Sequence, residues 1–213
     1  MSKLVQQRLG QTLGYTAYGL LSTGGFVYYL RNSTIGHTMN PWLLFGGTVA
    51  MIFGAHLCDY QTMYPLKLAM YTGMTGMIGV SLLPLIQASS MALVADAALA
   101  TGVSMTSLAA IAYNAPSEQF LNWGGPLALG CGGMFAVSLM TMFYPQSRAL
   151  YNIWLWGGLG LTGALTLYKT QAIIYRAKTE QYFDPLGNSI GIYMDAVNFF
   201  VRFMMILGNR KQK

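Results

Sequence analysis

Charged residues are the scarcest class in this chain. Its 213 residues include 12 lysines and arginines and 6 aspartates and glutamates, or 8% of the total. A soluble domain carries about 25% charged residues, so this chain cannot cover a water-exposed surface of its size. Disorder is excluded because 54% of the residues are hydrophobic. A lipid bilayer accepts such a composition, since it faces apolar side chains directly. We therefore predict a polytopic membrane protein.

Cysteine is also scarce, with Cys58 and Cys131 alone in separate apolar stretches. Their spacing predicts neither a disulfide framework nor a metal site, so we expect both to be small buried hydrophobic residues. The sequence holds no nucleophile elbow, metal triad or phosphate-binding loop, and we expect no enzyme activity, no cofactor and no metal. Lysines and arginines are scattered singly between apolar segments, which is typical of membrane topology signals rather than of nucleic-acid binding.

Long apolar segments recur along the chain. A helical span needs about 20 mostly apolar residues, and seven segments approach or exceed that length: 11–30, 41–58, 66–86, 91–113, 123–144, 149–175 and 189–207. Barrel strands are about ten residues long and alternate in polarity, a pattern that is absent from the sequence. We predict an all-α membrane protein of six to seven transmembrane helices, forming one domain over residues 1–213.

The last apolar segment, residues 189–207, leaves the topology open. If it crosses the membrane, lysines and arginines divide equally between the two sides. If it dips in and returns, they concentrate on one side, as the positive-inside rule favours. At the other end, Lys3 and Arg8 lead straight into an apolar segment, so we expect no cleavable signal and a retained first helix.

Three polar residues share one face of the last segment. Asp195, Asn198 and Arg202 are spaced i, i+3 and i+7 on an otherwise apolar helix. Ionisable groups inside a span cost at least about 2.5–3.5 kcal/mol each, so the stripe must face protein or water. Two interpretations remain open: an ion or proton site, or an interior polar clamp. Lys169, on the preceding segment, can snorkel to the interface or turn inward to meet Asp195.

Several motifs in the carboxy-terminal half suggest a family. Leu167–Gln171, the pair Asp184-Pro185 and Ile192–Arg202 resemble the carboxy-terminal signature of the transmembrane Bax inhibitor family. The stretches 115–122 and 208–211 resemble its growth-hormone-inducible transmembrane protein branch, which resides in the mitochondrial inner membrane.

The resemblance implies a seven-helix bundle whose central last helix is wrapped by the other six. It also implies calcium leak or cation/proton exchange governed by two aspartates, one in an Asp-Thr-Gln motif and one on the last helix. Here the second is Asp195, but the first position is Lys169, followed by Thr170 and Gln171. A lysine turns repulsion between carboxylates into attraction, and the pair stays ionised near pH 7. We therefore expect a latch, built on Lys169 and Asp195, that disables the ion pathway.

Two functions follow from this departure. The first is a structural or accessory subunit of a larger, respiratory-type assembly in the mitochondrial inner membrane, with membrane lipids and other subunits as partners. The alternative is a pH-regulated calcium or proton channel or exchanger of the same membrane, with calcium or protons bound only if transport is retained. Neither function involves nucleic acid.

Overall fold

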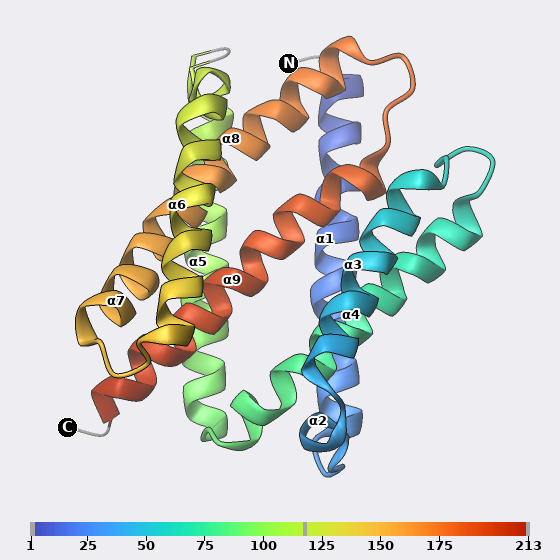
Figure 1. The fold of residues 1–213 in the computed structure, drawn as a ribbon. Coiled ribbons are helices and arrows are strands. Elements are labelled where there is room, and N and C mark those ends of the chain that lie inside the picture. Colours follow the sequence, from blue (N-terminus) through green and yellow to red (C-terminus); the bar gives the residue numbers. More distant parts are fainter. Residues whose placement is uncertain (1–2, 117–118, 212–213) are drawn as a thin grey trace. The chain divides into compact units, whose positions relative to one another are not determined.

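The fold is built of helices (Figure 1). The computed structural model describes residues 3–116 and 119–211. These residues contain seven helices of 17 or more residues and no strand, which confirms the predicted all-α class. Within the described residues, four helical stretches are long and apolar enough to cross a membrane: 64–87, 91–114, 121–143 and 185–209. The chain is therefore a multi-pass membrane protein, as its composition predicted.

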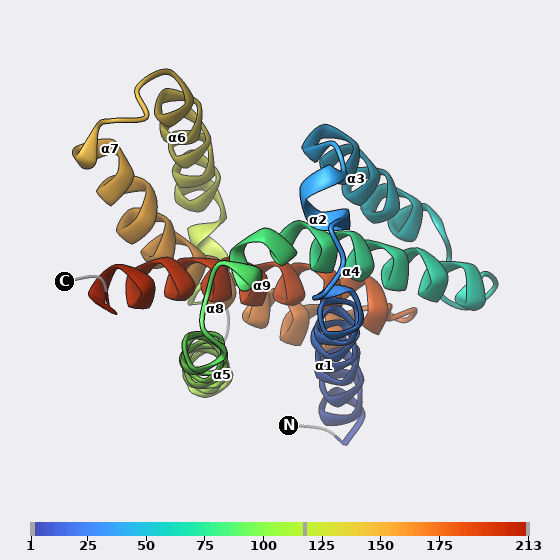
Figure 2. The same cartoon turned by 90° about the horizontal axis from the view of Figure 1, so that it is seen from below.

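Contacts between residues divide the chain into two compact units. The first unit contains the residues up to Val94 together with Glu180–Tyr193. Within it, α4 packs against three other helices (Figures 1 and 2). The central helix of this group is α4 (Tyr64–Gln87), and its three neighbours are α1 (Lys3–Leu30), α2 (Ile35–Thr38) and α3 (Pro41–Leu57). The expectation of one domain over residues 1–213 stays a prediction.

The second unit contains Ala95–Thr179 and the chain from Met194 onward. Here α6 packs against both α7 and α8 (Figure 2). The elements are most of α5 (Met91–Asn114), η1 (Leu121–Trp123), α6 (Gly124–Phe143), α7 (Arg148–Asn152), the π-helical turn η2 (Ile153–Gly157) and α8 (Gly158–Thr179). The segment predicted to be helical over 149–175 is indeed helical, but it contains a π turn that its apolar pattern did not predict.

Side-chain caps mark the starts of α3 and α7. Asn40 accepts a hydrogen bond from the backbone N–H of Trp42 at 2.9 Å, with Pro41 in the first turn of α3. Ser147 similarly caps α7 by accepting from the N–H of Leu150 at 3.4 Å. Such caps satisfy backbone donors that have no partner within the helix. They fix where these two helices start, which apolar periodicity alone does not.

Helix α9 (Pro185–Lys211) is one unbroken helix of 27 residues. It contributes Pro185–Tyr193 to the first unit and its remaining residues to the second. It begins four residues before the predicted segment 189–207 because Asp184 caps it and Pro185 occupies its first turn. A segment that dips into a membrane and returns needs a reversal of the chain, so the unbroken helix favours a full crossing. Its central place in the bundle stays a prediction.

Candidate functional site

Lys169 and Asp195 form an ion pair in the second unit. The Lys169 ammonium on α8 lies 2.6 Å from Oδ1 of Asp195 on α9. The hydroxyl of Thr166, one turn before Lys169, donates to Oδ2 of the same carboxylate at 3.4 Å. The Asp195 side chain is 3% exposed, whereas that of Lys169 is 30% exposed. Lys169 thus turns inward to meet Asp195, the second of the two orientations considered from the sequence.

A row of threonines on α8 continues from this pair. Thr162, Thr166 and Thr170 follow one another at intervals of four residues, and all three are buried. We call these residues the threonine row. The hydroxyls of Thr162 and Thr166 each donate to the carbonyl four residues earlier, at 2.8 and 2.9 Å. A polar strip is therefore kept inside the protein without leaving these hydroxyls unsatisfied.

Asn198 does not join the site. Its side chain is exposed, and its amide donates to the backbone carbonyl of Met194 at 3.0 Å, within its own helix. The expectation that Asp195, Asn198 and Arg202 act together is wrong for this residue. On a helix with 3.6 residues per turn, position i+3 points about 60° away from position i, while position i+7 points only about 20° away. Arg202 thus shares the buried face of Asp195, and Asn198 falls outside it.

Arg202 is buried against the π turn. It is 9% exposed, and its Nη1 donates to the carbonyls of Trp154 and Leu155 at 2.5 and 3.4 Å. Its guanidinium lies over the Trp154 ring, 4.7 Å from the centroid. A Cβ at Gly158 would collide with the guanidinium, so the absence of a side chain there admits it. Among the described residues, no carboxylate forms an ion pair with Arg202.

Gln171 holds the connection between α5 and α6. Its side-chain oxygen accepts a hydrogen bond from the backbone N–H of Phe120 at 2.6 Å, and its amide donates to the carbonyl of Pro116 at 3.1 Å. Gln171 is buried. Gln171 belongs to the motif recognised in the sequence, but the partners of its side-chain amide could not be predicted from that motif. Glu118, within the same connecting stretch, lies outside the described residues.

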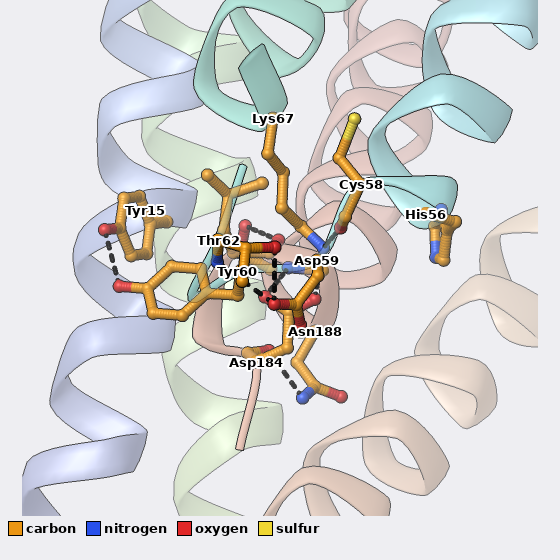
Figure 3. A network of polar contacts seen from close by, with 12 residues as sticks. Tyr15, His56, Cys58, Asp59, Tyr60, Thr62, Lys67, Asp184 and Asn188 are labelled. Atoms are coloured by element: carbon orange, nitrogen blue, oxygen red, sulfur yellow. Dashed lines mark hydrogen bonds and ion pairs between the residues drawn. The ribbon is translucent and has the colours of Figure 1, made fainter. Parts of the chain in front are cut away.

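A second lysine–aspartate pair lies in the first unit and was missed by the sequence reasoning (Figure 3). Lys67, near the start of α4, contacts Oδ2 of Asp184 at 2.5 Å and donates to the carbonyl of Cys58 at 2.9 Å. The Lys67 side chain is 2% exposed and that of Asp184 34%. Oδ1 of Asp184 caps α9 by accepting from the N–H of Gly187 at 2.9 Å. The sequence Asp184-Pro185 is typical of a helix start, with Asp as the cap and Pro in the first turn, and this signal could have placed Asp184 at the start of α9.

The cysteines differ in environment. Cys58 is buried, as expected, and its backbone carbonyl accepts from Lys67. Cys131 is exposed on α6, so the expectation that it is buried is wrong. Cys131 lies in a candidate membrane span, and few residues of that span are covered by protein. An apolar stretch of this kind therefore does not imply that its residues are buried within the protein. Among the described residues, no three His, Cys, Asp or Glu side chains are grouped so that they could hold a metal ion.

Comparison with known proteins shows the family of this chain. The family model described as inhibitor of apoptosis-promoting Bax1 matches residues 5–212. The chain belongs to the Bax inhibitor family. It is 34% identical, over 98% of its length, to growth hormone-inducible transmembrane protein of Rattus norvegicus, and it spans 65% of the length of that protein.

Two further members of the Bax inhibitor family are more distant. The chain is 28% identical over 78% of its length to probable Bax inhibitor 1 of Paralichthys olivaceus, covering 72% of that protein. It is 23% identical over 87% of its length to Bax inhibitor 1 of Schizosaccharomyces pombe, covering 68%. In this member of the family, Lys169 occupies the position where the sequence resemblance implies an aspartate. Its ammonium forms an ion pair with Asp195, the aspartate that is retained.

Proposed function

We propose that this Bax inhibitor family protein is a structural or accessory subunit of a larger assembly of the respiratory type in the mitochondrial inner membrane. Its ion pathway is disabled by Lys169. The observation that carries the proposal is the 2.6 Å contact between the Lys169 ammonium and the Asp195 carboxylate. The resemblance of residues 115–122 and 208–211 to the mitochondrial branch supports the location.

The geometry explains how Lys169 would close the pathway. Two neighbouring carboxylates share a proton and respond to pH. Here Oδ1 of Asp195 accepts from Lys169 and Oδ2 accepts from Thr166. A cation approaching Asp195 therefore meets an ammonium already in place, and both carboxylate oxygens already have donors. Displacing the ammonium would leave Asp195 buried without its countercharge, which is strongly unfavourable.

The surface of the second unit is consistent with a subunit role. Within the unit, few residues of the spans 91–114 and 121–143 are covered by protein, and both are strongly apolar. Such faces need lipid or other membrane helices around them. Short connections between the helices, such as 88–90 and 144–147, leave little room for a soluble domain within the described residues.

A second candidate function is pH-regulated calcium or proton transport. It is favoured by the 30% exposure of the Lys169 side chain. A lysine with a long, flexible stem can move its ammonium outward, and this movement would uncover Asp195. The pair would then act as a gate that opens, rather than as a permanent latch.

Reconstitution in liposomes separates these functions. We expect the wild-type protein to pass neither calcium nor protons, as read by dyes trapped inside the vesicles. Lys169→Asp is expected to create a flux that changes between about pH 6 and 8, because two carboxylates then share the site. Lys169→Arg keeps a cation and is the control that stays closed. Flux through the wild-type protein would overturn the latch and support the transporter.

The subunit role has its own test. After mild detergent extraction of mitochondria and native electrophoresis, we expect the protein to migrate within a larger assembly. Migration only as a free 23.3 kDa monomer would contradict a subunit role. Such a result would not bear on the latch, which the liposome experiment tests separately.

A further inference from the structure

Arg202 carries a buried positive charge that the proposed latch does not use. It is nine-tenths buried, and its Nε has no hydrogen-bond partner. Its Nη1 is held by backbone carbonyls of the π turn, and no described carboxylate forms an ion pair with it. Backbone carbonyls can hold a guanidinium in place, but they do not cancel its charge. An ionised group kept in this state inside a membrane protein calls for a functional explanation.

The threonine row links Arg202 to the Asp195 pair. Thr166 donates to Asp195, and Thr162 donates to the carbonyl of Gly158, the residue against which the Arg202 guanidinium lies. Asp195 and Arg202 are seven residues apart on α9, which is about two helical turns on one face. The buried polar strip on α8 therefore has a cation at each of two places: Lys169 beside Asp195, next to Thr166, and Arg202 over Gly158.

The charges along this strip do not cancel. Lys169 and Arg202 are positive and Asp195 is negative, so the interface keeps one net positive charge. Charges interact strongly in a low-dielectric interior, and a fixed arginine in a pore repels cations. Lys169 is paired directly with Asp195, so the charge without a counterion is that of Arg202.

We propose that Arg202 is a second, independent electrostatic barrier to cations at the α8–α9 interface. This inference rests on the proposed function, because it concerns the same pathway that Lys169 closes. Lys169 acts by pairing with the acid, whereas Arg202 acts through its charge about two helical turns away along α9. Restoring the acid at position 169 therefore removes one barrier and leaves the other.

The test uses two substitutions of similar size that differ in charge. Calcium flux into liposomes is compared for Lys169→Asp/Arg202→Met and Lys169→Asp/Arg202→Lys. Both variants lose the planar guanidinium, but only the second keeps a positive charge. We expect at least a tenfold higher flux with methionine than with lysine. Equal flux through the two, including no flux through either, would overturn the proposal.

Two controls keep the outcome readable. Circular dichroism and size-exclusion chromatography in detergent report whether each variant is folded. If the methionine variant is not, Arg202→Gln replaces it, since glutamine removes the charge but keeps an amide donor for the Trp154 carbonyl. The ratio between the two double variants tests Arg202 alone. Flux through the wild-type protein tests the proposed function. A failure of the Arg202 proposal can therefore be distinguished from a failure of the proposed function.

Discussion

The ion pair between Lys169 and Asp195 is asymmetric. Its atoms lie 2.6 Å apart, but the lysine side chain is 30% exposed and the aspartate side chain only 3%. Lysine has a long stem that can carry its ammonium to water, whereas a short buried carboxylate cannot follow. The two partners therefore depend on the pair to different degrees, and this difference can be measured.

Removing Lys169 is expected to destabilise the protein more than neutralising Asp195. Lys169→Met leaves a buried carboxylate unpaired, a loss of about 3 kcal/mol, at the lower end of the range for buried pairs because the lysine is partly exposed. Asp195→Asn leaves an ammonium that can move outward. The free energy of unfolding in mixed micelles of increasing SDS content measures both. The exposed Lys178 gives the control: Lys178→Met is expected to change the stability by less than about 0.5 kcal/mol. Equal losses for Lys169→Met and Asp195→Asn would contradict this reasoning.

The pair between Lys67 and Asp184 has the opposite asymmetry, because here the lysine is the buried partner. Asp184→Asn keeps a good helix cap but leaves a buried ammonium without its countercharge, and we expect a loss of about 3 kcal/mol. Lys67→Met leaves a partly exposed carboxylate that still caps α9, and about 1 kcal/mol is lost with the hydrogen bond to Cys58. The same unfolding measurement gives the order of the two losses. The reverse order would show that the lost hydrogen bond from Lys67 to Cys58, rather than the unpaired ammonium, dominates.

Much of the fold could be predicted because long apolar runs specify membrane helices directly. The seven predicted segments all correspond to helices, and their ends differ where a cap such as Asp184 extends the helix. The meeting of Lys169 with Asp195 could be anticipated, since each is ionisable within an apolar helix. The contact of Lys67 could not, because Asp184 is far away in the chain and hydropathy does not encode which helices pack together.

The site of Arg202 shows a second limit of the sequence. Periodicity placed Arg202 on the face of Asp195, which is correct, but it gave no indication of its partners. These are backbone carbonyls of the π turn, and nothing in the apolar pattern of residues 149–175 marks that turn. The prediction for Asn198 was wrong for a related reason. A residue three positions further along a helix points about 60° away and lies only at the edge of the same face.

Gly158 should be required for Arg202 to occupy its place. A Cβ at Gly158 would collide with the guanidinium, and overpacking of this kind typically costs about 1–3 kcal/mol. Gly160 lies on the same helix, and a Cβ there meets no atom within 4 Å. Gly158→Ala is expected to lower the stability, while Gly160→Ala leaves it unchanged or raises it by up to about 1 kcal/mol, since alanine favours helix. Equal effects of the two substitutions would show that the guanidinium adapts without cost.

The loop between α3 and α4 provides a prediction that depends on pH. The backbone N–H of Thr62, followed by its hydroxyl, lowers the pKa of the exposed Asp59, and both donate to Oδ2 at 3.0 Å. A carboxyl whose pKa is lower in the folded state contributes stability above its unfolded pKa, and that contribution is lost as the pH falls through the folded value. Thr62→Val removes the hydroxyl but keeps the N–H, so the pKa of Asp59 should rise only part of the way to its ordinary value. The side-chain ¹³C signal of Asp59, assigned with Asp59→Asn, gives this pKa directly. An unchanged pKa would mean that the N–H alone holds the carboxylate, whereas a return to the ordinary value would mean that the hydroxyl also keeps the turn in place.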